Sequence, residues 1–206
     1  MNKELIIIRH ARSMNNVGKC DSLDSSITPW GIKQAKNVGK FLSSKMDLKD
    51  FKFFTSPFLR CLETCSHINE AFYNKNPFQI KSELREYINH SGTNVHVPNR
   101  WNDFDEKNGI YWHNFPLDGI NYNQEFNEQI FGRLNDFYQS LPPKSLIVTH
   151  GLPLMVLSHI ATNNNHVIPV WDYSIDNCSI TYIINGRKIW HGRNLFHEEY
   201  CESDCN

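Results

Sequence analysis

Two histidines and several arginines stand where buried strands are expected to give way to polar residues. Arg9 and His10 follow the apolar run Leu5–Ile8, and His150 follows Ser145–Thr149. A neutral imidazole is a nucleophile that can accept a phosphoryl group. Phosphoryl transfer is catalysed by positioning together with cationic groups, and the planar guanidinium of arginine binds phosphate oxygens bidentately. The pattern therefore points to phosphoryl chemistry, with His10 as the candidate nucleophile and His150 as a donor to the transferring oxygens.

The candidate phosphate-binding cations are Arg9 and Arg60, with Arg12 as a further candidate. Arg60 comes shortly after Thr55 and Ser56, the polar end of another apolar run. Each residue is ambiguous alone, because a single histidine at a strand end is more often structural and a lone arginine is more often a cation on a helix surface. The hypothesis depends on the combination.

The alternation of strands and helices predicts the framework that brings these residues together. Apolar runs predict strands at Leu5–Ile8, Phe51–Phe54, Phe78–Ile80 and Ser145–Thr149, and a strand pair, Ser179–Ile184 and Lys188–Trp190, around an Asn-Gly turn. Thr28-Pro29 and Ser56-Pro57 are typical of helix starts, and helical spacing recurs over about 126–141 and 152–160. We predict a three-layer α/β/α sandwich with a mostly parallel central sheet. Ligands bind beyond the carboxyl ends of such strands, so three neighbouring strands would combine their polar ends into one site.

A stretch without clear periodicity is expected to be a lid inserted at about 88–120 in a single domain, 1–206. It is rich in Asn, Gly, Pro and aromatic residues, and the aromatic residues argue against disorder. Two interpretations of its large side chains are open: they face a ligand and stack on a base or sugar, or they form a small core of the lid itself. The side chains concerned are Arg100, Trp101, Tyr111, Trp112, His113 and Phe115.

Composition limits the classes of partner. Lys plus Arg is 21 and Asp plus Glu is 22, and a formal net charge of −1 gives no general attraction to nucleic acid or membrane. No secretory signal or membrane-spanning apolar segment is recognisable. The 6 cysteines contain no CxxC pair, which favours free thiols in a cytoplasmic protein. His197, Cys201 and Cys205 are too few ligands for a zinc site.

Five short motifs, in order along nearly the whole chain, resemble those of the histidine phosphatase superfamily, also called phosphoglycerate-mutase-like. They are "IIIRHARSMNN", "ITPWGIKQA", "SPFLRCLET", "LRE" and "VTHG", followed by "NCSITYI" and Trp190. Each motif is weak alone, but five in this order are not expected by chance. The resemblance implies that His10 attacks phosphate and becomes phosphohistidine. It also implies that Arg9, Arg60 and His150 hold the phosphate oxygens, with help from Asn16.

The same resemblance implies that Glu86 protonates the leaving group and then activates water, a role that suits the poor leaving ability of an alkoxide. The competing interpretation makes Glu86 a surface carboxylate paired with Arg85. No metal and no other cofactor is expected, because the arginines supply the charge that a metal ion supplies elsewhere.

The chain departs from the family pattern in three places. Ala11 replaces the usual Gly, and Arg12, which faces either the pocket or solvent, stands where relatives often carry Glu or Gln. After Glu86, "YINHSG" lacks both the "RHYG" of glycolytic mutases and the "GxxxG" spacing common in phosphatases. We expect a metal-independent phosphomonoester hydrolase acting through phosphohistidine on a small phosphorylated metabolite. The alternatives are a phosphoglycerate-mutase-type phosphotransferase and, less favoured, a non-catalytic phosphate-binding module. The sequence specifies neither the substrate nor the oligomeric state.

Overall fold

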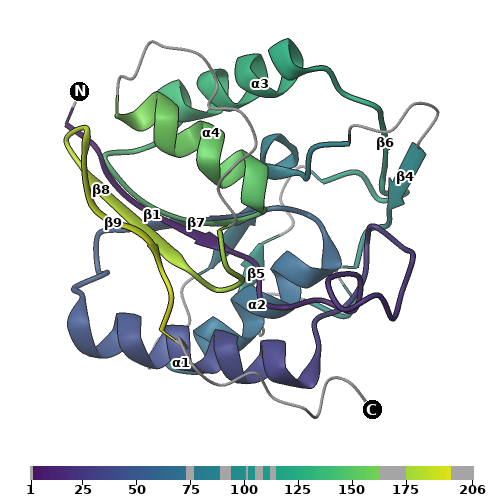
Figure 1. Ribbon diagram of the computed structural model, residues 1–206, viewed down its shortest axis with the longest axis horizontal. Helices are drawn as coiled ribbons and strands as arrows, with labels where there is room; N and C mark the ends of the chain where they lie inside the picture. Colours follow the sequence, from purple (N-terminus) through teal and green to yellow (C-terminus); the bar gives the residue numbers. More distant parts are fainter. Residues whose placement is uncertain are drawn as a thin grey trace.

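A mostly parallel sheet runs through the computed structural model, which describes residues 2–72, 77–88, 94–100, 102–104, 109–111, 115–162 and 175–195. Within these ranges the sheet has seven strands in the order β5-β3-β2-β7-β1-β8-β9 (Figure 1). They are β1 (Glu4–Arg9), β2 (Lys52–Thr55), β3 (Phe78–Ile80), β5 (Ile110–Tyr111), β7 (Lys144–Thr149), β8 (Ile180–Ile184) and β9 (Arg187–Arg193). The first five strands in this order pair in parallel. β8 pairs antiparallel with both of its neighbours, β1 and β9.

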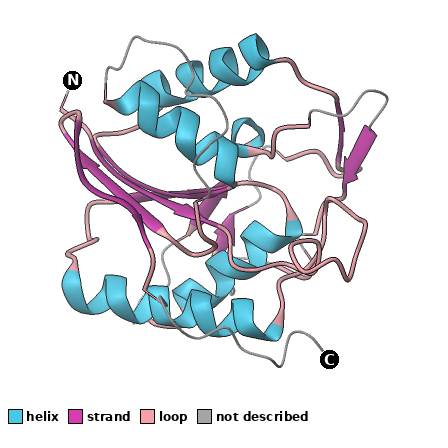
Figure 2. Ribbon diagram, viewed as in Figure 1, coloured by secondary structure: helices cyan, strands magenta, loops and turns pink. Residues whose placement is uncertain are grey.

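Helices cover both faces of the sheet, which confirms the predicted three-layer arrangement (Figure 2). They are α1 (Pro29–Lys45), α2 (Leu59–Asn69), α3 (Asn127–Ser140) and α4 (Gly151–Ala161). Successive side chains of a strand point to opposite faces. In β1, Ile6 and Ile8 therefore pack in the core with α1 and α2, whereas Leu5 and Ile7 pack in the core with α3 and α4. This double burial explains the uninterrupted apolar run that precedes Arg9.

Both predicted helix starts are followed by helices. Thr28 caps α1 by accepting a hydrogen bond from the N–H of Gly31 at 3.0 Å, and Pro29 is the first helical residue, as predicted. The helix expected to follow Ser56-Pro57 is present as α2, which has Phe58 as its N-cap and begins at Leu59. Its first N–H donates to Asp24 Oδ1 at 2.7 Å. A carboxylate from a distant segment thus contacts the first helical residue, and the hydroxyl of Ser56 accepts a hydrogen bond from the N–H of Phe58, the N-cap, at 3.4 Å.

The stretch expected to be a lid contains regular structure that its sequence did not reveal. β4 (Asn94–Val97) pairs antiparallel with β6 (Ile120–Asn123), and β5 extends the main sheet; a single turn of 3-10 helix, η1 (Ser82–Leu84), precedes this stretch. Phe115 is buried in the core that contains α1 and α2, so its side chain contributes to packing. Trp101, Trp112, His113 and the side chain of Tyr111 lie outside the described part of the chain. A lid function for this stretch stays a prediction.

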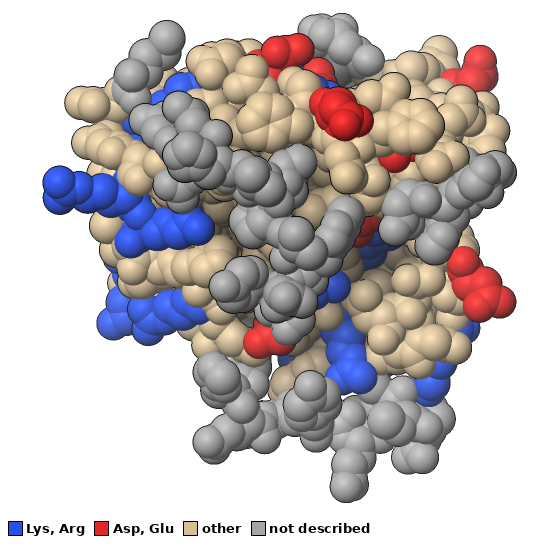
Figure 3. Space-filling model, turned by 45° about the horizontal axis from the view of Figure 1, so that its top comes forward, with Lys and Arg blue, Asp and Glu red and all other residues tan. Residues whose placement is uncertain are grey.

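Charges of both signs lie on the surface of the molecule. On the face drawn in Figure 3, Lys and Arg lie at the left edge, near the centre and at the lower right, whereas Asp and Glu lie at the top, at the right and below the centre. Among the helices described, none is long and apolar enough to cross a membrane. Cys20, Cys61, Cys65 and Cys178 are free, and His197, Cys201 and Cys205 lie outside the described residues.

Candidate active site

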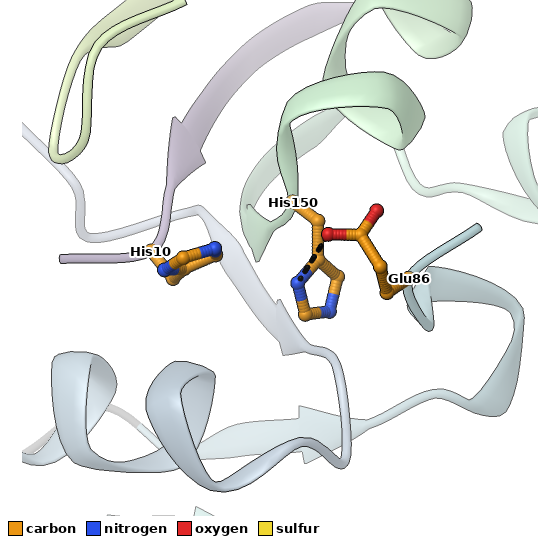
Figure 4. Close-up of side chains that lie close together, drawn as sticks. All are labelled: His10, Glu86 and His150. Atoms are coloured by element: carbon orange, nitrogen blue, oxygen red, sulfur yellow. Dashed lines mark ion pairs between the residues drawn. The ribbon is translucent and has the colours of Figure 1, made fainter. Parts of the chain in front are cut away.

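The carboxyl ends of β2, β7 and β1 lie side by side, as the sequence predicted for three neighbouring strands. Arg9 is paired in register with Thr149, and Thr55 with Val148. His10, Ser56 and His150 follow directly, so one edge of the sheet carries all three side chains. Figure 4 shows the His150 ring between His10 and Glu86, which comes from the segment after η1.

His10 is buried and held in one tautomer. Its Nδ1 lies 2.8 Å from the carbonyl oxygen of Ala11, which can only accept a hydrogen bond, so Nδ1 carries the proton. Nε2 is therefore unprotonated, and its lone pair accepts a hydrogen bond from Arg60 Nε at 3.1 Å. Burial, then Arg60 and Arg9, hold the pKa of His10 well below its usual value. The imidazole is neutral near pH 7, which is the form that can act as a nucleophile.

Arg60, in the first turn of α2, joins His10 to Glu86. Its Nη2 lies 3.3 Å from Glu86 Oε2, and its Nη1 donates to the carbonyl of Leu23. The side chain is 5% exposed. A guanidinium held on three sides in a nearly dry position is oriented without further loss of conformational entropy, which suits it to bind an anion beside His10.

Arg9 brings a second cation to the same edge. Its Nη1 donates to the carbonyl of Ile175. Within the described residues, its Nε is buried and has no hydrogen-bond partner. Burial lowers the pKa of Arg9. An unpaired buried N–H is costly unless something accepts it, so Arg9 has a donor to offer an anionic ligand.

His150 is fully buried at the start of α4. Ser56 Oγ lies 2.8 Å from its Nε2, and the Phe58 ring packs edge-on with centroids 5.1 Å apart. Burial and the charge of Arg60 hold the pKa of His150 well below its usual value. Its Nδ1 is 3.4 Å from Glu86 Oε2 without the alignment of a hydrogen bond. Because the ring is neutral, this contact is no ion pair until His150 gains a proton.

Glu86 faces the histidines and does not pair with Arg85. Its Oε1 accepts a hydrogen bond from the N–H of Tyr87 at 3.0 Å, and its Oε2 approaches Arg60 and His150. Arg85 instead donates to Glu125 at 2.9 Å. The interpretation of Glu86 as a surface carboxylate paired with Arg85 is therefore wrong.

Asn16 is fixed by its side-chain oxygen. Its Oδ1 accepts from Ser13 N at 3.1 Å, Ser13 Oγ at 3.0 Å and Asn177 Nδ2 at 3.2 Å. With that oxygen occupied, Asn16 offers a ligand the donors of its Nδ2. Asn177 also donates to the His10 carbonyl at 3.0 Å. Asn177 is the first residue of the motif "NCSITYI", and the motif did not indicate this contact.

The two unusual residues after His10 are accommodated by α1 and α2. Ala11 is buried, its N–H donates to Thr64 Oγ1 at 3.0 Å, and it is not among the described residues with positive φ, so it needs no glycine. The N–H of Arg12 donates to Gln34 at 3.0 Å. A Cβ on Gly31 would lie 2.4 Å from the Arg12 carbonyl oxygen, which explains the glycine of "ITPWGIKQA". These contacts fix the backbone of Arg12, and phosphate binding by its side chain stays a prediction.

The cluster suits an anion better than a metal ion. His10, Glu86 and His150 each offer one ligand atom, and these atoms lie within 4.8 Å of one another. Two imidazoles and a carboxylate are a common zinc ligand set. Arg60, however, lies 3.1 Å from His10 Nε2 and 3.3 Å from Glu86 Oε2, so a cation there would meet the guanidinium.

A family model decides the affiliation of the chain. The model of the histidine phosphatase superfamily (branch 1) matches residues 5–195. The chain belongs to this superfamily. A comparison with curated proteins found no match. The resemblance carried by the five sequence motifs is thus confirmed.

Solved structures of two phosphatases and of a hydrolase share this fold. The α-ribazole phosphatase of Shigella flexneri is 21% identical with a TM-score of 0.59, over 87% of this chain and 89% of that chain. Mycobacterial hydrolase 1 is 18% identical with a TM-score of 0.65, over 95% and 100%. A phosphoserine phosphatase of Entamoeba histolytica, in complex with 3-phosphoglyceric acid, is 18% identical with a TM-score of 0.58, over 91% and 94%. At these identities the likeness establishes the fold.

Three contacts in and near the candidate active site were missed by the sequence interpretation. Ser56 was expected at a helix start but bonds to His150, and Asp24 and Asn177 were not singled out. Each acts across a long sequence separation, and no local spacing marks such contacts. The signal available was membership in a motif, for Ser56 in "SPFLRCLET" and for Asn177 in "NCSITYI".

Proposed function

We propose that this histidine phosphatase superfamily member is a metal-independent phosphomonoester hydrolase that acts through a phosphohistidine at His10 on a small phosphorylated metabolite. The observation that carries the proposal is the tautomer of His10, whose unprotonated Nε2 is held by Arg60 beside Glu86. The buried free thiols Cys61, Cys65 and Cys178 fit a cytoplasmic setting, where thiols stay reduced.

In the first step, the Nε–H of Arg60 turns from His10 Nε2 to a phosphate oxygen. Nε2 then attacks phosphorus, and the bond from phosphorus to the leaving oxygen breaks. Protonated Glu86 gives its proton to that oxygen, so the leaving group departs as an alcohol. The positive charge that develops on the ring is stabilised through Nδ1–H and the Ala11 carbonyl, 2.8 Å apart. Arg9, Arg60, His150 and Asn16 hold the equatorial phosphate oxygens and stabilise the transition state.

In the second step, water replaces the alcohol on the same side of the phosphoryl group. Glu86, now a carboxylate, takes a proton from the water as its oxygen bonds to phosphorus. The bond from phosphorus to Nε2 breaks, and the electron pair returns to His10. Inorganic phosphate leaves, and both residues regain their starting protonation states. No step requires a metal, because the guanidinium groups carry the charge stabilisation.

Hydrolysis is favoured over the two alternatives. A mutase-type phosphotransferase would pass the phosphoryl group to a second substrate, and the "YINHSG" that follows Glu86 departs from the mutase sequence. A non-catalytic phosphate-binding module has no need of a nucleophilic tautomer beside a carboxylate. Mixing the trapped phosphoenzyme with phosphoglycerate in water distinguishes hydrolase from mutase, since a mutase transfers the group to phosphoglycerate in preference to water.

Turnover of p-nitrophenyl phosphate in EDTA at mildly acidic pH tests the proposal. The wild-type protein is expected to release nitrophenol, and His10→Ala is expected to be inactive. His67→Ala serves as the matched control, because His67 pairs with Glu70 on the surface of α2. A requirement for divalent metal, or full turnover by His10→Ala, would overturn the mechanism. A panel of phosphorylated metabolites, with His10→Ala as the blank, then identifies the substrate.

A further inference from the structure

A buried carboxylate lies behind the segment that carries Glu86. Glu125 is 3% exposed, and Arg133 donates two hydrogen bonds to its carboxylate. Nε donates to Oε1 at 2.6 Å, and Nη2 donates to Oε2 at 2.7 Å. Arg85 Nη2 adds a third contact to Oε1 at 2.9 Å. A carboxylate is costly to bury unless it is paired and hydrogen-bonded, and this one is matched by two cations. Nothing in the proposed reaction uses it.

The same residues fix the backbone on both sides of Glu86. Arg133 donates from Nη1 to the carbonyl of Glu83 and from Nη2 to that of Arg85 at 3.2 Å. The N–H of Glu125 donates to the carbonyl of Ile88 at 2.8 Å. Glu125 and Arg133 thus hold three backbone carbonyls around Glu86. Two of them precede Glu86 in the chain and one follows it.

We propose that Glu125 and Arg133 are positioning residues for the general acid. They touch no reacting atom, but they fix the peptide from which Glu86 projects. The Glu86 side chain is 24% exposed, and its own contacts are single ones of 3.0 to 3.4 Å, so its place depends on its backbone. An acid must lie within hydrogen-bond reach of the leaving oxygen, and displacements of about 1 Å cost about 10²-fold in rate. This inference rests on the proposed role of Glu86 as general acid.

A positioning role and a merely structural role predict different results. If the pair only docks α3, its loss lowers stability and affects all substrates equally. If it positions Glu86, its loss harms most the substrates whose leaving groups need a proton. Nitrophenolate is stable as an anion and needs little protonation, whereas phenolate is more basic and needs more. Phenyl phosphate and p-nitrophenyl phosphate differ little in size, so their ratio of kcat/KM reports on proton donation.

The experiment measures that ratio for wild type, Glu86→Gln, Arg133→Ala and Glu125→Gln. Glu86→Gln should lower kcat/KM for phenyl phosphate by about 10²–10⁴-fold, and much less for the nitro compound. Arg133→Ala and Glu125→Gln should shift the ratio in the same direction, by about tenfold or more. Glu125→Gln is nearly isosteric, so it carries the test if Arg133→Ala does not fold.

The matched control is Lys3→Met, because Lys3 precedes β1 and its side chain contacts the carboxyl end of α3. Lys3 Nζ donates to the carbonyls of Tyr138 and, at 2.9 Å, Leu141, near the end of α3. Its loss should lower stability and leave the ratio unchanged. Two results would overturn the positioning role. Arg133→Ala and Glu125→Gln could leave the ratio of kcat/KM values at its wild-type value, or Lys3→Met could shift that ratio as much as they do. If Glu86→Gln itself leaves the ratio unchanged, the proposed role of Glu86 as acid fails instead.

Discussion

Replacing Arg60 by alanine should disable the site in two separable ways. The guanidinium contacts the nucleophile and the proposed acid together, with Nε 3.1 Å from His10 Nε2 and Nη2 3.3 Å from Glu86 Oε2. In a buried site, losing one preorganised donor to the transition state costs about 2.7–4 kcal/mol. We therefore expect kcat/KM for p-nitrophenyl phosphate to fall by about 10²–10³-fold.

The second effect is on the protonation of the nucleophile. The pKa of His10 is held low first by burial and then by the charge of Arg60. Arg60→Ala removes that charge, so the pKa of His10 should rise. A higher pKa places more of the imidazole in the protonated, non-nucleophilic form at mildly acidic pH. The acid limb of the pH–rate profile should therefore move to higher pH.

Arg60→Lys separates the two effects, because lysine keeps the charge and lacks the planar fork. It should retain the low pKa of His10 but recover little of the turnover. The assay combines steady-state kinetics with an NMR titration of His10. Arg193→Ala is the control, since Arg193 at the end of β9 lies over the rings of Phe41 in α1 and Trp190 in β9. The reasoning on Arg60 would be refuted if Arg60→Ala lowered kcat/KM by less than threefold, or if it left the pKa of His10 unchanged.

Three further predictions concern stability and local support. His10 and His150 have lowered pKa values when folded, so the unfolded state binds more protons as the pH falls below about 6.5. The free energy of unfolding should then decrease by up to about 2.7 kcal/mol for each pH unit. His10→Ala should halve that slope when the free energy is measured by urea titration. A free energy of unfolding that does not change with pH would contradict the neutral state of the two histidines. Asn177→Ala should lower kcat/KM by about tenfold without a comparable loss of stability, because it removes the donor to the His10 carbonyl; unchanged kinetics would deny that support. Gly31→Ala should cost about 1–3 kcal/mol of thermal stability, since the new methyl would lie 2.4 Å from the Arg12 carbonyl oxygen; an unchanged Tm would show that the loop yields freely.

Features set by local pattern were predictable from the sequence. The apolar run before Arg9 marks a strand buried on both faces, and parallel strands end at one edge of a sheet. That reasoning brought His10 and His150 together without a structure. The hydrogen bond from the first N–H of α2 to Asp24 was not predictable, because Asp24 comes from a distant segment.

Features set by contacts between distant segments were not predictable. β4 shows apolar alternation at Val95 and Val97, but its partner β6 begins beyond β5, and no turn signal joins them. The triad of Glu125, Arg85 and Arg133 likewise assembles from two loops and a helix. Charged residues at such spacing are ordinary on a surface, and only the fold reveals that this carboxylate is buried.

Trapping the phosphorylated protein tests the role of His10 most directly. Wild-type protein is mixed briefly with substrate, denatured in alkali, and analysed by peptide mass spectrometry and ³¹P NMR. We expect one phosphoryl group on His10, attached at Nε2 because Nδ1 is bonded to the Ala11 carbonyl. It should form and decay at rates consistent with turnover, and His10→Ala should show none. Turnover with no phosphohistidine, or with the group on another residue, would contradict the proposed mechanism.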